Sequence, residues 1–129
     1  MRIDVRNTGM NYHGESDRGM QLDIALGPQK PDEDESMSPL ELFAASLGMC
    51  VAAMLRNHCD ERELECGEIK VTVESEWDPG EPICENIEVT VVVDGEWDER
   101  RKAAFLKVAE TCPVHQSIVS CGGVNIEIV

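Results

Sequence analysis

Cysteine is the residue type in this chain best suited to chemistry, because a thiolate attacks peroxides and disulfides and binds metals. The six cysteines are at positions 50, 59, 66, 84, 112 and 121. No signal peptide is visible, so this pattern indicates free thiols, metal ligands or redox chemistry rather than a disulfide scaffold. Cys59 and Cys66, next to His58, have a spacing that fits one helix face, but no second pair completes a zinc set. We therefore expect neither a metal nor another cofactor.

Two of the cysteines stand out by their neighbours. Cys112 precedes Pro113, which ends one helix and can begin another, so Cys112 is expected near a helix N-cap. Free backbone amides and the helix dipole favour a thiolate there. Cys50 lies in an apolar helix, where burial alone raises the pKa of a thiol. Taken alone, either cysteine is better explained as a small core residue.

The helix that carries Cys50 has a well-marked start. Ser38 is a good N-cap, Pro39 suits the first helical position, and Glu41 falls where a capping box places an acid. Between residues 40 and 55 Glu41 is the only charged residue, and the helix is expected to reach Gly67. A helix that is apolar all round is buried on all sides. One chain of this size can hardly surround it, which indicates a partner subunit.

Alternating polar and apolar residues predict strands on both sides of this helix. Three short strands fill the first 26 residues, and a solvated acidic loop over 27–37 follows. A hairpin is expected over 69–77 and 87–93, around the turn "DPGEP". A second helix over 98–111 and a last strand over 124–129 complete the chain. The order βββ-α-ββ-α-β predicts an α+β fold in a single domain, residues 1–129.

The composition excludes several function classes. The chain has 129 residues and a net charge of −15, with no basic cluster to neutralise phosphates, so nucleic acid and anionic membranes are not expected partners. The longest uncharged apolar stretch is shorter than the roughly 20 residues of a membrane span. A cytoplasmic protein is expected. Its acidity fits either a high-salt cytoplasm or an ordinary acidic surface.

The segments "SPLELFAASLGMC" and "CPVHQSI" together resemble the OsmC/Ohr family of thiol peroxidases, and the order of elements matches over essentially the whole chain. The resemblance implies an intertwined homodimer whose sheets wrap around two central helices, with active sites at the subunit interface. It implies that Cys50 attacks a hydroperoxide and becomes a sulfenic acid. Cys112 then condenses with Cys50 to a disulfide, which an external dithiol reduces.

The chain departs from the family pattern at the residues that activate the first cysteine. Strongly active members carry a Glu ten residues before it and an Arg near the second strand. Here the first of these positions is Leu40, and Asn11 aligns near the second, with Arg18 the nearest alternative. Glu41 is nine residues before Cys50, which is half a turn net on an ideal helix, so it points away and is better explained by the capping box.

The sequence therefore leaves three interpretations. The first is a cysteine-based reductase of organic hydroperoxides in oxidative-stress defence, with Cys50 and Cys112 catalytic and with Glu41 and His115 as auxiliary candidates. His115 lies one helical turn after Cys112, where an imidazole can act as a cation or base. The second is a dimer of the same fold without peroxidase activity that binds a small hydrophobic or thiol-reactive ligand. The third, a structural stress protein with incidental thiols, is weaker.

Overall fold

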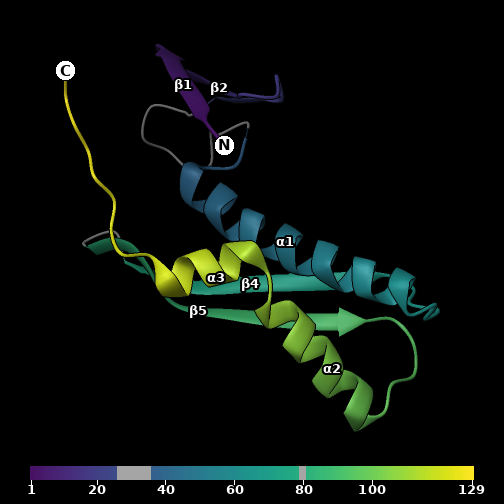
Figure 1. The fold of residues 1–129 in the computed structure, drawn as a ribbon. Coiled ribbons are helices and arrows are strands. Elements are labelled where there is room, and N and C mark those ends of the chain that lie inside the picture. The colour runs from purple at the N-terminus through teal and green to yellow at the C-terminus, as the bar shows by residue number, and fades with distance from the viewer. Residues whose placement is uncertain (26–35, 79–80) are drawn as a thin grey trace. The chain divides into compact units, whose positions relative to one another are not determined.

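The computed structural model describes residues 1–25, 36–78 and 81–129 (Figure 1). The chain forms two units, residues 1–42 and 43–129, and each is described here by itself. Most of the loop expected over 27–37, and the centre of the turn "DPGEP", lie outside the described residues. The single domain expected over the whole chain stays a prediction.

The first unit contains the three expected strands. They are β1 (Ile3–Thr8), β2 (Asn11–Ser16) and β3 (Gln21–Ala25), antiparallel in the order β1-β2-β3. Gly9, with a φ of 60°, makes the tight turn between β1 and β2, where most other residues would be strained. The apolar side chains of Ile3, Val5 and Leu22 in these strands are exposed.

The long helix α1 (Pro39–Glu61) begins as predicted. The Ser38 hydroxyl accepts a hydrogen bond from the Glu41 amide, and the Glu41 carboxylate accepts one from the Ser38 amide, which completes the capping box. The helix ends at Glu61, earlier than the expected Gly67. Glu63 adopts a left-handed φ of 52°, and the Leu64 amide donates to the Cys59 carbonyl, so the chain turns back there.

The hairpin of the second unit is formed as predicted, except that its second strand begins at Glu81, six residues earlier than the expected residue 87. It pairs β4 (Ile69–Asp78) with β5 (Glu81–Val93) in an antiparallel register that sets Val71 opposite Val91. Its inner side chains pack against a buried stripe of α1 at four-residue spacing: Leu47, Val51, Leu55 and Cys59. Gly48 allows this close approach, since a Cβ there would lie 3.3 Å from Val73.

Two further helices complete the second unit. They are α2 (Glu99–Glu110), which is capped by Asp98 and lies where a second helix was expected, and α3 (Pro113–Ser120). Phe105 of α2 is buried in the same core as the α1 stripe. The strand expected over 124–129 is not formed, and residues 121–129 have no regular structure (Figure 1). The backbone groups of a strand must pair with a neighbouring strand, and this chain offers that segment none among its described residues.

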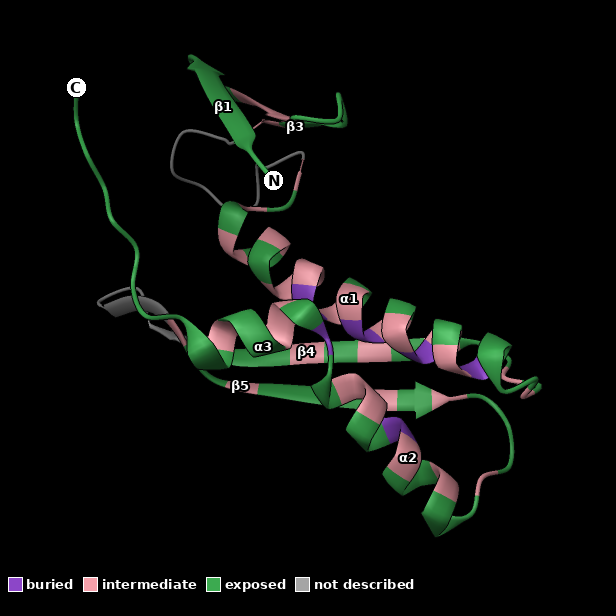
Figure 2. Ribbon diagram, in the orientation of Figure 1, coloured by how far each residue is buried: buried purple, intermediate pink, exposed green. Residues whose placement is uncertain are grey.

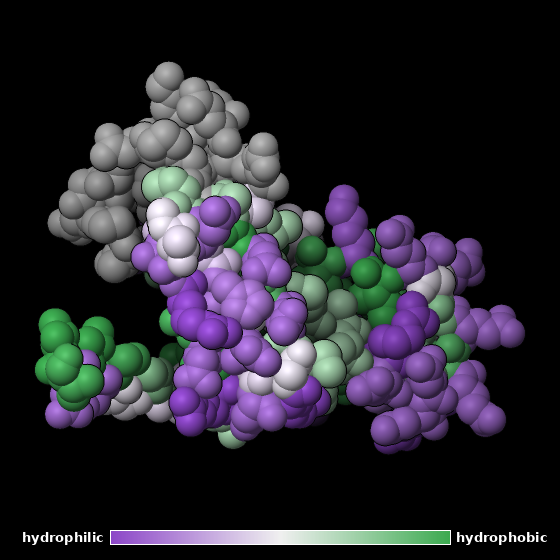
Figure 3. Space-filling view, turned by 90° about the horizontal axis from the view of Figure 1, so that it is seen from above, coloured by the Kyte–Doolittle hydropathy of each residue, from purple (hydrophilic) through white to green (hydrophobic). Residues whose placement is uncertain are grey.

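The core of the second unit is small, and α1 is buried on one side only (Figure 2). The expectation that this helix is covered on all sides is therefore not met within one chain. Phe43 and Met49 are exposed on α1, and Figure 3 shows apolar side chains open to the outside between hydrophilic ones. By length and composition alone α1 is long and apolar enough to cross a membrane, but the core helix of a soluble protein passes the same test.

Candidate functional site

Cys112 occupies the N-cap of α3, as its position before Pro113 predicts. Its Sγ accepts a hydrogen bond from the backbone amide of His115, at 3.5 Å. The side chain is fully buried in the core of the second unit. The start of α3 therefore presents its unpaired amides to a sulfur atom rather than to water.

Cys50 lies on α1, half-buried, and packs against the core cluster that contains Cys112, whose side chain is near enough to influence the Cys50 thiol. Burial raises the pKa of the Cys50 thiol above its usual value, and the side chain of Cys112 raises it further. The backbone amide of Val114, in the first turn of α3, acts in the opposite direction and lowers this pKa. Two cysteines far apart in the sequence thus meet where the middle of α1 faces the N-terminus of α3.

This arrangement can do two kinds of chemistry. Two thiols in contact can lose two electrons and two protons to an oxidant and form a disulfide. The amides of Val114 and His115 also supply hydrogen bonds and positive helix-dipole charge to a developing thiolate. None of the groups that set the Cys50 pKa is a cation, so Cys50 is held mainly as the neutral thiol.

The side chains of the two auxiliary candidates, His115 and Glu41, form hydrogen bonds with local partners. The His115 ring is held through Nδ1 by the backbone carbonyl of Glu110, at 3.1 Å, and it is the His115 amide that reaches Cys112. The Glu41 carboxylate is engaged in the capping box, and its hydrogen bonds with Ser38 hold the pKa of Glu41 below the usual value. Both residues are explained by local helix structure.

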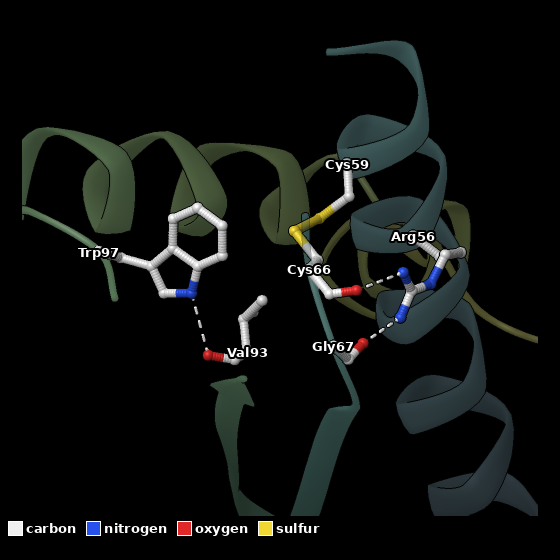
Figure 4. The surroundings of a disulfide bond; sticks show 6 residues. All are labelled: Arg56, Cys59, Cys66, Gly67, Val93 and Trp97. Carbon is white, nitrogen blue, oxygen red and sulfur yellow. Dashed lines mark hydrogen bonds between the residues drawn. A yellow bond between two sulfur atoms is a disulfide. The ribbon is translucent and has the colours of Figure 1, made fainter. Parts of the chain in front are cut away.

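Cys59 and Cys66 form a disulfide, which corrects the expectation that they are free thiols (Figure 4). Cys59 ends the buried stripe of α1, and Cys66 lies in the loop that turns back toward β4. Arg56 fixes the same loop, because its guanidinium donates to the backbone carbonyls of Cys66 and Gly67 (Figure 4). The reversal at Glu63 brings the two cysteines together, and the helical spacing of the sequence does not reveal it.

Other polar residues have structural partners. His13 bonds through Nδ1 to the Asp23 carboxylate at 2.6 Å, directly across the β2–β3 pairing. Tyr12 lines a cavity of about 630 Å³ in the first unit. Trp97 packs edge-on against Phe105, and its indole donates to the Val93 carbonyl, so it belongs to the core. Within residues 1–25, 36–78 and 81–129 no cluster of side chains is arranged to hold a metal.

Comparison with known proteins identifies the family. A family model described as OsmC-like protein matches residues 31–128. The chain belongs to the OsmC-like protein family. The resemblance inferred from the two cysteine segments is therefore confirmed, together with the α+β fold. No curated protein matches this OsmC-like chain.

Solved structures show the same fold. An OsmC-like protein from Mycoplasma pneumoniae superposes with a TM-score of 0.73 at 16% identity, over 94% of this chain and 89% of that one. An organic hydroperoxide resistance protein from Elizabethkingia anophelis gives 0.65 at 20% identity, over 94% and 90%. The organic hydroperoxide resistance protein OhrB of Bacillus subtilis gives 0.56 at 26% identity, over 96% and 92%.

Proposed function

We propose that this OsmC-like protein reduces organic hydroperoxides with Cys50 as the nucleophile and Cys112 as the resolving thiol. The Cys50 thiolate attacks the terminal oxygen of the hydroperoxide, the O–O bond breaks, and the alcohol leaves with a proton. Cys50 is then a sulfenic acid, and the Cys112 sulfur displaces its hydroxyl group as water to give a disulfide. An external dithiol returns both cysteines to thiols and is itself oxidised.

The proximity of the Cys50 and Cys112 side chains in one core cluster is the observation that carries this proposal. Resolution needs the second sulfur at the site of the first, and the N-terminus of α3 brings it there. The surrounding side chains are apolar, among them Leu47, Val51 and Met54, which favours an organic peroxide over hydrogen peroxide. Two of the similar structures carry the name organic hydroperoxide resistance protein, which supports the same substrate class.

Disulfide mapping after a single oxidant pulse tests the proposal. Reduced protein is treated with one equivalent of cumene hydroperoxide, quenched with an alkylating agent and digested for mass spectrometry. We expect a Cys50–Cys112 bond to form with one equivalent of cumyl alcohol, and a Cys112→Ser variant to stop at the Cys50 sulfenic acid. Cys121→Ser, which removes an exposed free thiol, is the matched control and should behave as wild type. An unreactive Cys50 sinks the proposal.

One observation favours a second function, binding without peroxidase activity. The groups around Cys50 raise its pKa and include no cation, so the neutral thiol predominates at neutral pH. A thiol in an apolar wall is suited to a small hydrophobic or thiol-reactive ligand. The same experiment separates the two functions, because a binding protein would consume no hydroperoxide and would still take up a hydrophobic ligand.

We further propose that the working form is a cytoplasmic homodimer. Apolar side chains are left uncovered on β1 and β3 of the first unit and on α1 of the second. The last residues alternate as a strand does, yet Val124, Ile126 and Ile128 are almost fully exposed. A second copy of the chain provides the strand partner and the apolar cover that one copy lacks.

A further inference from the structure

Outside the cysteine pair, the second unit has a cavity of about 400 Å³ where the C-terminal end of α1 meets the start of α2. Three arginines and one histidine are among the residues that line it: His58, Arg62, Asp98, Arg100, Arg101 and Ala104. This concentration of basic groups is unusual in a chain with 11 lysines and arginines against 26 acidic residues. The other lysines and arginines are spread along the sequence, so this cavity is a basic site in an otherwise acidic protein.

The arginines of this cavity form no ion pair with a carboxylate of the described residues. Among the described residues, ion pairs form at Arg2, Arg6 and Lys102, but none includes Arg62, Arg100 or Arg101. The one acid in the lining, Asp98, is engaged as the N-cap of α2, where its carboxylate accepts the Arg101 amide. The positive end of the α2 dipole adds to the charge at the same place.

His58 supplies an independent sign that a polar ligand belongs there. Its Nε2 atom is buried and has no hydrogen-bond partner, which is the one such case among the described side chains. The ring is held edge-on by Phe105, with centroids 6.0 Å apart. A buried ring nitrogen without a partner costs free energy. A small shift of the ring that exposes Nε2 to an oxyanion in the cavity would supply the missing acceptor when that atom carries its hydrogen.

We propose that this cavity binds the phosphate group of a small phosphorylated molecule. Guanidinium groups match phosphate oxygens in paired hydrogen bonds, and a phosphate group offers several arginines more oxygens and more negative charge than a carboxylate does. The volume exceeds that of inorganic phosphate alone and lies in the range of small-molecule sites. The site is separate from the cysteine pair, because His58 lies eight residues after Cys50, roughly 12 Å along the helix axis.

Phosphate titration of the reduced, full-length protein tests the site. The chain has three histidines, so the imidazole of His58 can be followed by nitrogen-15 NMR and assigned by its loss in His58→Asn. At constant pH and ionic strength, inorganic phosphate and glycerol 3-phosphate are each expected to shift the Nε2 resonance along a saturable curve. Glycerol 3-phosphate should bind more tightly than inorganic phosphate, and acetate should leave the resonance in place.

A matched pair of variants separates a site from general attraction. Arg101→Gln should weaken phosphate binding by about tenfold or more, because it removes a charged hydrogen bond. Lys102→Gln removes the same charge from the next residue of α2, outside the cavity lining, and should change binding by less than about twofold. Equal weakening in the two variants, a shift that never saturates, or an equal response to acetate would overturn the proposal. The readout does not involve Cys50, so it stands or falls independently of the peroxidase test.

Discussion

At the scale of single residues, Cys50 is subject to opposing influences. Burial and the neighbouring Cys112 thiol favour its neutral form, whereas the Val114 amide favours the thiolate. The balance is a raised pKa, so the fraction of thiolate at neutral pH is small. Peroxide reduction by this residue should therefore depend steeply on pH.

The alkylation of Cys50 by iodoacetamide measures this dependence. Because the pKa is raised, the rate should still climb by about tenfold per pH unit through pH 7 and 8, as the thiolate fraction does below the pKa. Quenched samples analysed by mass spectrometry follow the Cys50 peptide alone. In Cys112→Ala one of the causes of the shift is gone, and the curve should move to lower pH. A rate that is already level at pH 7 would contradict the expectation and point to a cation supplied by a partner subunit.

Glu41 provides a second residue-scale prediction, in stability. Its pKa is lowered in the folded state by hydrogen bonds with Ser38, so its ionised form stabilises the fold above the usual pKa of 4.5. This contribution is lost as the pH falls through the lowered pKa. Glu41→Gln should therefore melt below wild type at pH 7, and the two melting temperatures should converge as the pH falls below the lowered pKa of Glu41. If wild type and Glu41→Gln differ in melting temperature by the same amount at every pH, the charge of Glu41 does not contribute. Glu41→Ala also loses the hydrogen bond to Ser38, so it should have the lowest melting temperature of the three proteins at pH 7.

At the scale of elements, α1 carries two cysteines whose partners come from two different places. Cys112 reaches the middle of the helix from the start of α3, and Cys66 reaches its end from the loop before β4. The disulfide and the Arg56 hydrogen bonds hold the same loop. The end of α1 is therefore fixed independently of the state of Cys50.

Removal of the disulfide should lower stability without changing the reactive pair. Loop-closure entropy for a separation of seven residues corresponds to about 2 kcal/mol. We expect Cys66→Ser to lose about that much free energy of unfolding in urea, measured in a Cys50→Ser background so that no second disulfide interferes. Dithiothreitol should lower the melting temperature of the parent protein and leave the variant unchanged. Sensitivity of both proteins to dithiothreitol would contradict this assignment.

Gly48 sets how closely α1 approaches the hairpin. A Cβ atom at this position lies 3.3 Å from Val73, which is tight, and a longer side chain has no room. Gly48→Leu should reduce the free energy of unfolding by about 1–3 kcal/mol through overpacking. Gly48→Ala serves as the matched variant and should be nearly neutral, since alanine gains about 1 kcal/mol of helix propensity against a small clash. Equal stability of the two variants in urea would show that the helix moves away freely.

The elements show which features a sequence reveals. The start of α1, the hairpin pairing and the limits of α2 were predicted because caps and alternating residues act within a few positions. The Cys59–Cys66 bond was missed because it depends on the backbone reversal at Glu63. The contact of Cys50 with Cys112 came from family resemblance, since no local pattern joins residues so far apart. The strand predicted over 124–129 is wrong for a single chain, because a strand forms only when a neighbouring strand pairs with its backbone.

At the scale of the whole molecule, the uncovered apolar surface has a measurable consequence. The chain mass is 14.3 kDa, and we expect light scattering after size exclusion to give twice that mass. Deletion of residues 124–129 should shift the population toward monomer, because it removes exposed Val124, Ile126 and Ile128. A monomeric wild-type protein at micromolar concentration would contradict the proposed dimer. Deletion of residues 2–5 also removes exposed apolar side chains and serves as a comparison. A smaller loss of dimer in this variant would show that the C-terminal segment contributes specifically to dimer formation.

The Cys59–Cys66 bond has a practical effect on how oxidation of this protein is recorded. It joins residues seven positions apart, which barely changes the size of the denatured chain. A Cys50–Cys112 bond would instead enclose nearly half of the chain in one loop and make the denatured chain more compact. Non-reducing electrophoresis would thus register the long loop as faster migration and pass over the short one. In the denatured chain, the mass difference of two hydrogen atoms or the number of thiols that a labelling reagent counts distinguishes the short loop open from the short loop closed.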